Sequence, residues 1–329
     1  MEVDVVALNA QIKQESRFVQ KMIDEVGKVI VGQKEMVEGI LMGLLTGGHV
    51  LLEGVPGLAK TLTISTIAKS ISLDFHRVQF TPDLLPSDLV GTMIFNQKTS
   101  EFTPKLGPIF TNIVLADEIN RAPAKVQSAL LECMEEKQVT IGDKTHPLPA
   151  PFLVLATQNP LEQEGTYPLP EAQMDRFLFK IIVNYPEKAE EMEILNRMSK
   201  SEKPQIQPVI AKEDLLGAKR RLDDIYIEDK LKNYIVDIVL STREPRRYGL
   251  ASIENLISVG CSPRATISLT RASKAHAYLR GRGYVTAEDV KAIAYNVLRH
   301  RFVMSYEAEA EDMTADNLIK EIFDHVEVS

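Results

Sequence analysis

The feature that constrains the fold most is a turn between an apolar run and a helix-like run. Residues 50–52 are apolar, residues 53–61 carry two glycines and a proline, and residues 62–68 suit a helix. The pattern predicts a buried strand, a tight turn and a helix. In such a turn, successive backbone N–H groups and the helix dipole favour an anion. The stretch therefore predicts a phosphate-binding loop, although an ordinary strand, turn and helix would leave a similar trace.

Two side chains at the end of this loop suit a nucleotide. Lys60 is placed to charge the β- and γ-phosphates, and Thr61 to offer Mg²⁺ a hydroxyl ligand. Ala59 stands where the usual Gly-x-x-x-x-Gly-Lys-[Ser/Thr] pattern has its second glycine. A methyl group is tolerable there if the backbone is helical, since only a positive φ or a very close ligand demands glycine. The predicted nucleotide-binding residues of the loop are Gly54, Val55, Pro56, Gly57, Leu58, Ala59, Lys60, Thr61 and Leu62.

An acidic pair ends a second apolar run. Residues 113–116 are apolar and are followed by Asp117 and Glu118. At the C-terminal edge of a parallel sheet, this pair would lie beside the phosphate loop. Asp117 would then hold Mg²⁺ through water, and Glu118 would polarise the attacking water. A solvated strand end looks the same in isolation, but the two motifs in this order favour a nucleotide site.

A third strand-like run, residues 152–157, ends in a polar amide. Asn159 would meet the nucleotide there and hydrogen-bond the attacking water or the γ-phosphate, or else serve as a turn residue before Pro160. Residues 29–33 precede the phosphate loop. Val31 and Gly32 in this stretch are candidates for the base pocket, with plain core packing as the alternative.

Composition narrows the class of protein. A chain of 329 residues, 44% hydrophobic and 26% charged, predicts two globular domains. The net charge of −8 argues against a protein that grips nucleic acid non-specifically. Cys133 and Cys261 form no readable disulfide or zinc motif. We find no apolar run long enough for a membrane span and no signal core, so a cytoplasmic protein is expected.

The chain changes character near residue 186. Before it, strands and helices alternate, after an amphipathic helix at residues 7–27 and with polar-tipped hairpins near residues 93–102 and 139–145. After it, only helical patterns follow. We therefore expect an α/β domain over residues 1–186, an all-α domain over 187–305, and an acidic tail over 306–329 with a short, weakly docking helix. Arg264 begins one of the later helices, where an arginine is usually a solvated surface charge.

In their amino-acid sequences as well as their order along the chain, these motifs resemble those of an AAA+ ATPase, and more narrowly those of the MoxR family. The similar segments are GVPGLAKT, FTPDLLPSDLVG, ADEINRAPAKVQSALLE, ATQNPLEQEGTYPLPEAQMDRF and CSPRA, which together cover most of residues 28–300. Alanine before the loop lysine is common in that family. The resemblance implies a P-loop AAA+ module, with a five-stranded parallel sheet in the order 5-1-4-3-2, helices on both faces and a smaller helical lid.

The resemblance also assigns roles. Residues 91–105 match the insert within helix 2, and residues 138–149 match the hairpin before the sensor 1 strand; both face the pore in ring-shaped relatives. Arg176 matches the arginine finger that reaches a neighbouring subunit's γ-phosphate, and Arg264 the sensor 2 arginine. Arg121 is a candidate additional interface arginine. Lys60, Glu118, Asn159 and Arg176 would then be catalytic, and Thr61 and Asp117 would hold the metal.

The implied activity is Mg²⁺-dependent ATP hydrolysis in a homo-oligomeric ring, expected to be hexameric. The implied role is chaperone-like remodelling of a protein client with a von Willebrand factor A domain partner, in complex maturation or in cofactor or metal insertion. A magnesium-chelatase-like subunit and a nucleic-acid motor of helicase type are the alternatives, and the acidic balance disfavours the motor. A scaffold that binds nucleotide without hydrolysing it is disfavoured, because Glu118 is present to polarise the attacking water. A GTPase is disfavoured because we find no guanine motif.

Overall fold

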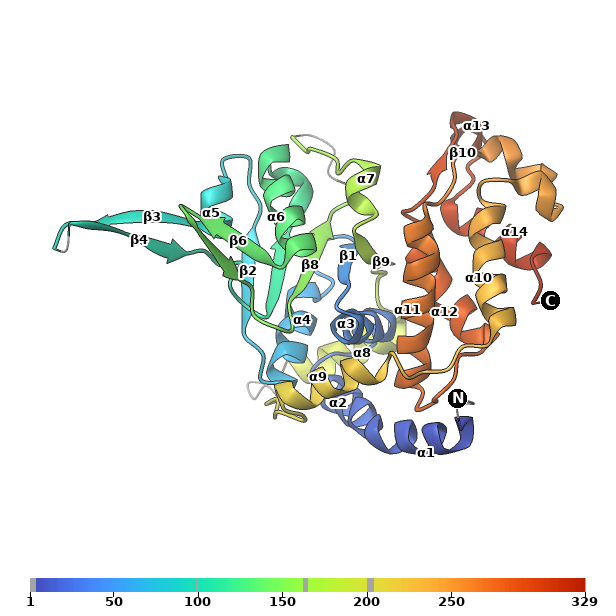
Figure 1. Ribbon diagram of the computed structural model, residues 1–329, viewed down its shortest axis with the longest axis horizontal. Helices are drawn as coiled ribbons and strands as arrows, with labels where there is room; N and C mark the ends of the chain where they lie inside the picture. Colours follow the sequence, from blue (N-terminus) through green and yellow to red (C-terminus); the bar gives the residue numbers. More distant parts are fainter. Residues whose placement is uncertain (1–3, 99, 162–164, 200–203, 329) are drawn as a thin grey trace. The chain divides into compact units, whose positions relative to one another are not determined.

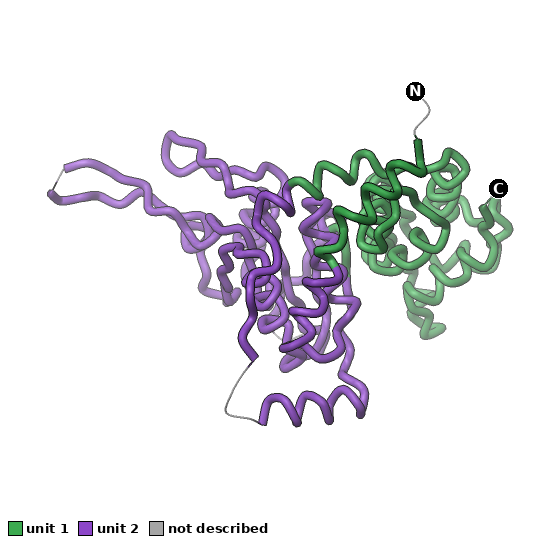
Figure 2. The backbone as a smooth tube through the Cα atoms, turned by 90° about the horizontal axis from the view of Figure 1, so that it is seen from below, with its two compact units in different colours: residues 1–19, 178–180, 217–329 green, residues 20–177, 181–216 purple. Residues whose placement is uncertain are grey.

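The computed structural model describes residues 4–98, 100–161, 165–199 and 204–328 (Figure 1). Contacts divide the chain into two compact units (Figure 2). We call residues 20–177 and 181–216 the α/β unit, and residues 1–19, 178–180 and 217–329 the helical unit. This division differs from the expected boundary at residue 186, because helix α8 (Lys188–Met198) groups with the α/β unit and helix α1 (Val5–Glu15) with the helical unit.

A five-stranded sheet organises the α/β unit. Its spatial order is β2-β5-β8-β1-β9, and the pairs β2–β5, β5–β8 and β8–β1 are parallel. Numbered along the chain without the hairpin strands, this is the order 5-1-4-3-2, so the predicted sheet is confirmed. The strands are β1 (His49–Glu53), β2 (Phe75–Gln79), β5 (Ile113–Asp117), β8 (Leu153–Gln158) and β9 (Phe177–Ile182).

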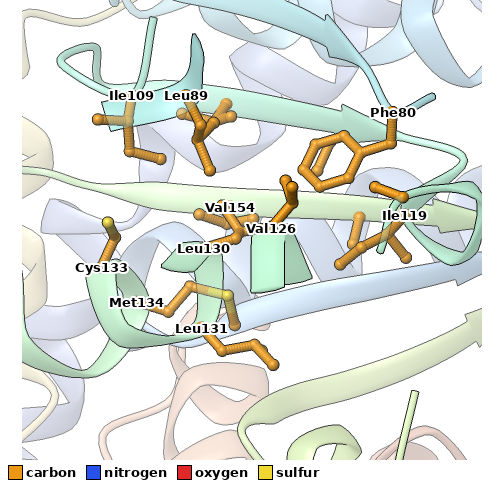
Figure 3. Packing of buried hydrophobic residues seen from close by; sticks show 14 of the residues in the cluster. Phe80, Leu89, Ile109, Ile119, Val126, Leu130, Leu131, Cys133, Met134 and Val154 are labelled. Atoms are coloured by element: carbon orange, nitrogen blue, oxygen red, sulfur yellow. The ribbon is translucent and has the colours of Figure 1, made fainter. Parts of the chain in front are cut away.

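Every second side chain of the buried strands points to the same face of the sheet and contributes to the hydrophobic core there. Val114 and Ala116 of β5 pack in one cluster with Val154 and Ala156 of β8, and these are every second residue of each strand. Helix α6 (Ala124–Glu136) covers this cluster with Val126, Leu130, Leu131 and Met134 (Figure 3). The central strands are buried on both faces, as a parallel sheet requires.

Helices also lie against the strands elsewhere in this unit. Helix α3 (Lys34–Thr46) contacts β1, and helix α4 (Lys60–Ser70) contacts β2 and β5. Each connects or precedes a strand, as crossover helices do in parallel sheets. Two further helices of the unit are short: α5 (Pro86–Val90) and α7 (Glu171–Met174).

Both predicted hairpins are present. Strands β3 (Gly91–Asn96) and β4 (Glu101–Leu106) pair antiparallel, and so do β6 (Gln138–Ile141) and β7 (Lys144–Pro147). The turn of the second hairpin uses Gly142 at φ +63°, a left-handed backbone that favours glycine. Figure 1 shows the first hairpin as a long ribbon away from the sheet.

Two expectations about helices at the ends of the chain are corrected by the structure. The helix expected over residues 7–27 is two helices, α1 and α2 (Arg17–Gly27), separated at Ser16. The tail does not dock weakly, because Leu318, Ile319 and Ile322 of α14 are fully buried. Helix α9 (Lys212–Arg221) crosses from the α/β unit into the helical unit, whose other helices are α10 (Asp229–Ser241), α11 (Pro263–Leu279), α12 (Ala287–Leu298), α13 (Tyr306–Ala310) and α14 (Ala315–His325).

Thr286 and Asp289 form a capping box at the start of helix α12. Asp289 accepts a hydrogen bond from the Thr286 backbone N–H at the start of α12. A small two-stranded sheet of β10 (Ile257–Val259) and β11 (Val303–Met304) completes the unit. In the described part of the chain, we find no helix that is both long and apolar enough to span a membrane.

Candidate nucleotide site

The phosphate loop lies between β1 and α4, as predicted. Gly54 leaves the strand with its N–H bonded to the Gln158 carbonyl at 3.2 Å. A Cβ on Gly54 would lie 2.6 Å from the Val183 carbonyl oxygen, so no other residue fits without moving the backbone. Helix α4 then begins at Lys60, so the unpaired backbone N–H groups of its first turn point into the loop.

Ala59 does not have the helical backbone that would make its methyl group easy to tolerate. Its φ is +54° and its ψ +19°, which is the left-handed region. That region costs a non-glycine residue roughly 1–2 kcal/mol, because Cβ approaches the next carbonyl oxygen. The condition under which the sequence analysis expected the methyl group to be tolerated is therefore not met. Gly57, at φ +89°, takes the other positive-φ position of the loop.

Lys60 points back into the loop. Its Nζ donates to the carbonyl oxygens of Gly54 at 2.5 Å and Val55 at 3.3 Å. Partial burial lowers the pKa of Lys60, while the negative charges of Asp117 and Glu118 act in the opposite direction. The ammonium group is thus held beside two carboxylates at the C-terminal edge of the sheet.

The acidic pair is held from the neighbouring strand. Thr157 of β8 donates its hydroxyl to Asp117 Oδ1 at 2.6 Å and accepts the Glu118 backbone N–H at 2.8 Å. Glu118 has a φ of +56° and is therefore a second non-glycine residue of this site in the left-handed region. Backbone strain of this kind is common at functional sites. Sequence reasoning missed Thr157, although its place at the end of β8 was a usable signal.

Two side chains of β2 also reach the acidic pair. Arg77 bonds Asp117, and Gln79 donates to Glu118 Oε2 at 2.9 Å. Arg121 meets the same carboxylate oxygen at 2.9 Å, so its partner within this chain is Glu118. Arg77 and Gln79 were missed as site residues, because a polar alternation on an edge strand looks like a solvated face.

Asn159 lies in the pocket and also has the contact of a turn residue. It is only 7% exposed and lines the same pocket as the loop and the acidic pair. Its Oδ1 also accepts the Leu161 N–H at 3.1 Å, the contact of a turn residue. The pocket has a volume of about 390 Å³ and is lined by Pro56, Gly57, Leu58, Ala59, Lys60, Thr61, Leu62, Arg77, Asp117, Glu118, Thr157, Gln158 and Asn159.

Several predicted residues lie outside this lining, and among them are Gly54 and Val55 at the start of the loop. Arg176 lines a second pocket of about 280 Å³ with Glu132, Glu135 and Glu136, and donates to the Leu131 carbonyl at 2.8 Å. Gly32, next to Val31, lies against the carboxylate of Glu190 at the start of α8. Arg264 belongs to the helical unit, where it follows Pro263 in the first turn of α11.

Comparison with known proteins agrees with this geometry. Residues 49–179 match the family described as ATPase family associated with various cellular activities (AAA), and residues 251–322 match an AAA lid domain. The lid match continues past residue 305 into α14, in line with the buried position of that helix.

Individual relatives are similar over nearly the whole chain. Chaperone MoxR1 of Mycobacterium tuberculosis is 48% identical over 95% of this chain and 82% of its own length. YeaC of Bacillus subtilis is 47% identical over 94% of each chain. A 2.00 Å crystal structure from Cytophaga hutchinsonii, of a candidate ATPase, has a TM-score of 0.91 at 52% identity and covers 98% of this chain and 97% of that one. The chain belongs to the MoxR family of AAA+ ATPases.

Proposed function

We propose that this protein is a Mg²⁺-dependent ATPase that remodels a protein client. The observation that carries the proposal is the meeting of Lys60, Asp117 and Glu118 in one pocket at the N-terminus of α4. A positive group, a metal-type carboxylate and a second carboxylate are what phosphoryl transfer to water requires.

The donors present fit Mg²⁺. Thr61 and Asp117 offer hard oxygen ligands in the same pocket. Among the described residues, no group of three or more His, Cys, Asp or Glu side chains could cage a metal. Mg²⁺ usually takes one or two protein ligands and completes its shell with phosphate and water, so this sparse set suits it. Bound there, Mg²⁺ would neutralise charge that develops on the phosphates.

The chain's own groups divide the remaining chemistry. Glu118 would accept the proton of the attacking water, and Asn159 would orient that water. Lys60 would hold the β- and γ-phosphates with the backbone N–H groups of residues 54–62. Val31 and Gly32 would contact the base, and Arg264 would sense the nucleotide from the lid.

Arg176 supports assembly. It lines a pocket other than its own chain's phosphate loop, so its role as an arginine finger requires a second protomer. In related systems an arginine finger contributes about 10³–10⁵ in rate, so the isolated subunit would be nearly idle. We therefore propose a homo-oligomeric ring, hexameric as in ring-shaped relatives, with hairpins β3–β4 and β6–β7 toward the pore.

The name of the Mycobacterium tuberculosis relative supports a chaperone role. We propose a cytoplasmic protein that acts with a von Willebrand factor A domain partner in complex maturation or in cofactor or metal insertion. The magnesium-chelatase-like and helicase-like alternatives share the same pocket. No observation on the described residues favours either, and the net charge of −8 speaks against the second.

The test measures steady-state ATP hydrolysis against protein concentration for the parent, Glu118→Gln and Arg176→Ala. A control variant, Glu213→Gln, removes an exposed carboxylate from α9. We expect specific activity to rise with concentration, both site variants to lose at least about 10²-fold, and a mixture of the two to recover part of the rate. Flat specific activity with Arg176→Ala unaffected would contradict assembly, and activity in Glu118→Gln would contradict the assigned base.

A further inference from the structure

One cation in the nucleotide pocket has no place in the roles above. Arg77 lines that pocket from β2, and its side chain is 50% exposed. Its Nε and Nη2 both donate to Asp117 Oδ2, at 2.9 and 2.6 Å. The guanidinium therefore lies on the carboxylate that we assign to the metal.

Asp117 is engaged through both of its oxygens. The Thr157 hydroxyl donates to Oδ1, and Arg77 occupies Oδ2. Thr157 is neutral and leaves the negative charge of the carboxylate in place. Arg77 cancels that charge, and any cation held through Asp117 must compete with it. An ion pair that is half exposed is worth at most about 1 kcal/mol, so it is weak enough to be displaced.

The contacts of Arg77 also continue to the general base. Arg77 and Gln79 are two residues apart on β2, so their side chains share one face of the strand. Arg77 Nη2 donates to Gln79 Oε1 at 2.9 Å, and Gln79 Nε2 donates to Glu118 Oε2 at 2.9 Å. A continuous set of hydrogen bonds thus links Asp117 to Glu118 through β2.

We propose that Arg77 is a positioning residue that competes with Mg²⁺ for Asp117. Departure of Arg77 from Asp117 accompanies metal uptake and at the same time removes a donor from Gln79, which shares Glu118 Oε2 with Arg121. The inference rests on the proposed function, because it assigns the metal to Asp117. It assigns Arg77 no contact with substrate.

The test is nucleotide binding without turnover. A fluorescent ADP analogue is titrated with Mg²⁺ in the parent, in Arg77→Gln and in Arg77→Met, which both remove the charge, and in Arg77→Lys, which keeps it. Lys105→Gln removes one cation from β4, outside the pocket lining, as the matched control. Because a competing cation is removed, we expect the half-maximal Mg²⁺ concentration to fall roughly fivefold in the two neutral variants.

Arg77→Lys should stay near the parent, and Lys105→Gln should match it, because neither removes the charge beside Asp117. A role for Arg77 in folding alone would change the unfolding temperature and leave the Mg²⁺ midpoint where it was. Unchanged midpoints in both neutral variants, with a parent that needs Mg²⁺, would overturn the inference and leave the proposed function standing. A parent that binds the analogue with no Mg²⁺ dependence would instead overturn the metal assignment itself.

Discussion

Asp117 and Asp289 are two aspartates with the same kinds of partner and opposite settings. Asp117 accepts from a threonine hydroxyl and an arginine at the edge of the sheet, and its side chain is 15% exposed. Asp289 accepts from the Thr286 hydroxyl, from Arg282 and from the Thr286 N–H, lies 2.6 Å from His276 Nδ1, and is fully buried.

The difference shows how the burial of an aspartate separates a structural role from a functional one. Around Asp289 the partners leave no room for solvent, so the network fixes the turn between α11 and α12. Around Asp117, Thr157 is buried, but the charged partner Arg77 is half exposed and can be exchanged. The pocket also holds two left-handed residues other than glycine, Ala59 and Glu118, although such residues occur elsewhere in the described chain as well, for example at Lys137.

The sharpest test of this comparison is to neutralise each aspartate. Asp289→Asn leaves Arg282 with its charge partner gone in a largely buried place, and we expect it to lose about 3–5 kcal/mol of unfolding free energy. Asp117→Asn should change stability by less than about 1 kcal/mol and abolish ATP turnover. Urea unfolding and hydrolysis rates on both variants check this. Equal losses of stability would break the comparison.

The second test uses pH. Hydrogen bonds from His276 and Arg282 hold the pKa of Asp289 well below its ordinary value, against the opposing effect of burial. A carboxyl whose pKa is lower in the folded state stabilises the fold above its unfolded pKa of about 3.9, and that contribution is lost as the pH falls through the folded pKa.

The stability difference between the parent and Asp289→Asn should therefore shrink steadily as the pH falls below about pH 4. Urea midpoints at a series of pH values measure it. A difference that stayed the same down to pH 3 would mean that the charge of Asp289 does not carry its stabilising effect.

The smallest expected effect concerns backbone strain in the loop. Ala59→Gly removes the left-handed penalty at φ +54° but frees the unfolded chain, so we expect a net gain of only about 0.5–1 kcal/mol. Ala68→Gly, inside α4, is the matched control and should lose stability, because its backbone is helical. A loss in Ala59→Gly would show that the methyl group makes contacts worth more than the strain.

The elements of this fold could be predicted because their signals are local. Residues 50–68 carry the strand, turn and helix within nineteen positions, and the runs before Asp117 and Asn159 end where β5 and β8 end. Residues 306–329 were misjudged, because a short acidic segment carries few apolar side chains. Leu318, Ile319 and Ile322 are buried because the rest of the helical unit presents a surface on which they pack, and that surface is not visible in the local sequence.

The sequence by itself determined the phosphate loop, the acidic pair and the alternation of strands and helices, since each rests on neighbouring residues. Only the tertiary structure decided which side chains bond across the sheet. Arg77 meets Asp117 forty positions away, and Thr157 meets it forty positions further on, because the parallel registers of β2, β5 and β8 bring them together. Register between distant strands leaves no local trace, and neither does the left-handed backbone that the closed loop imposes on Ala59.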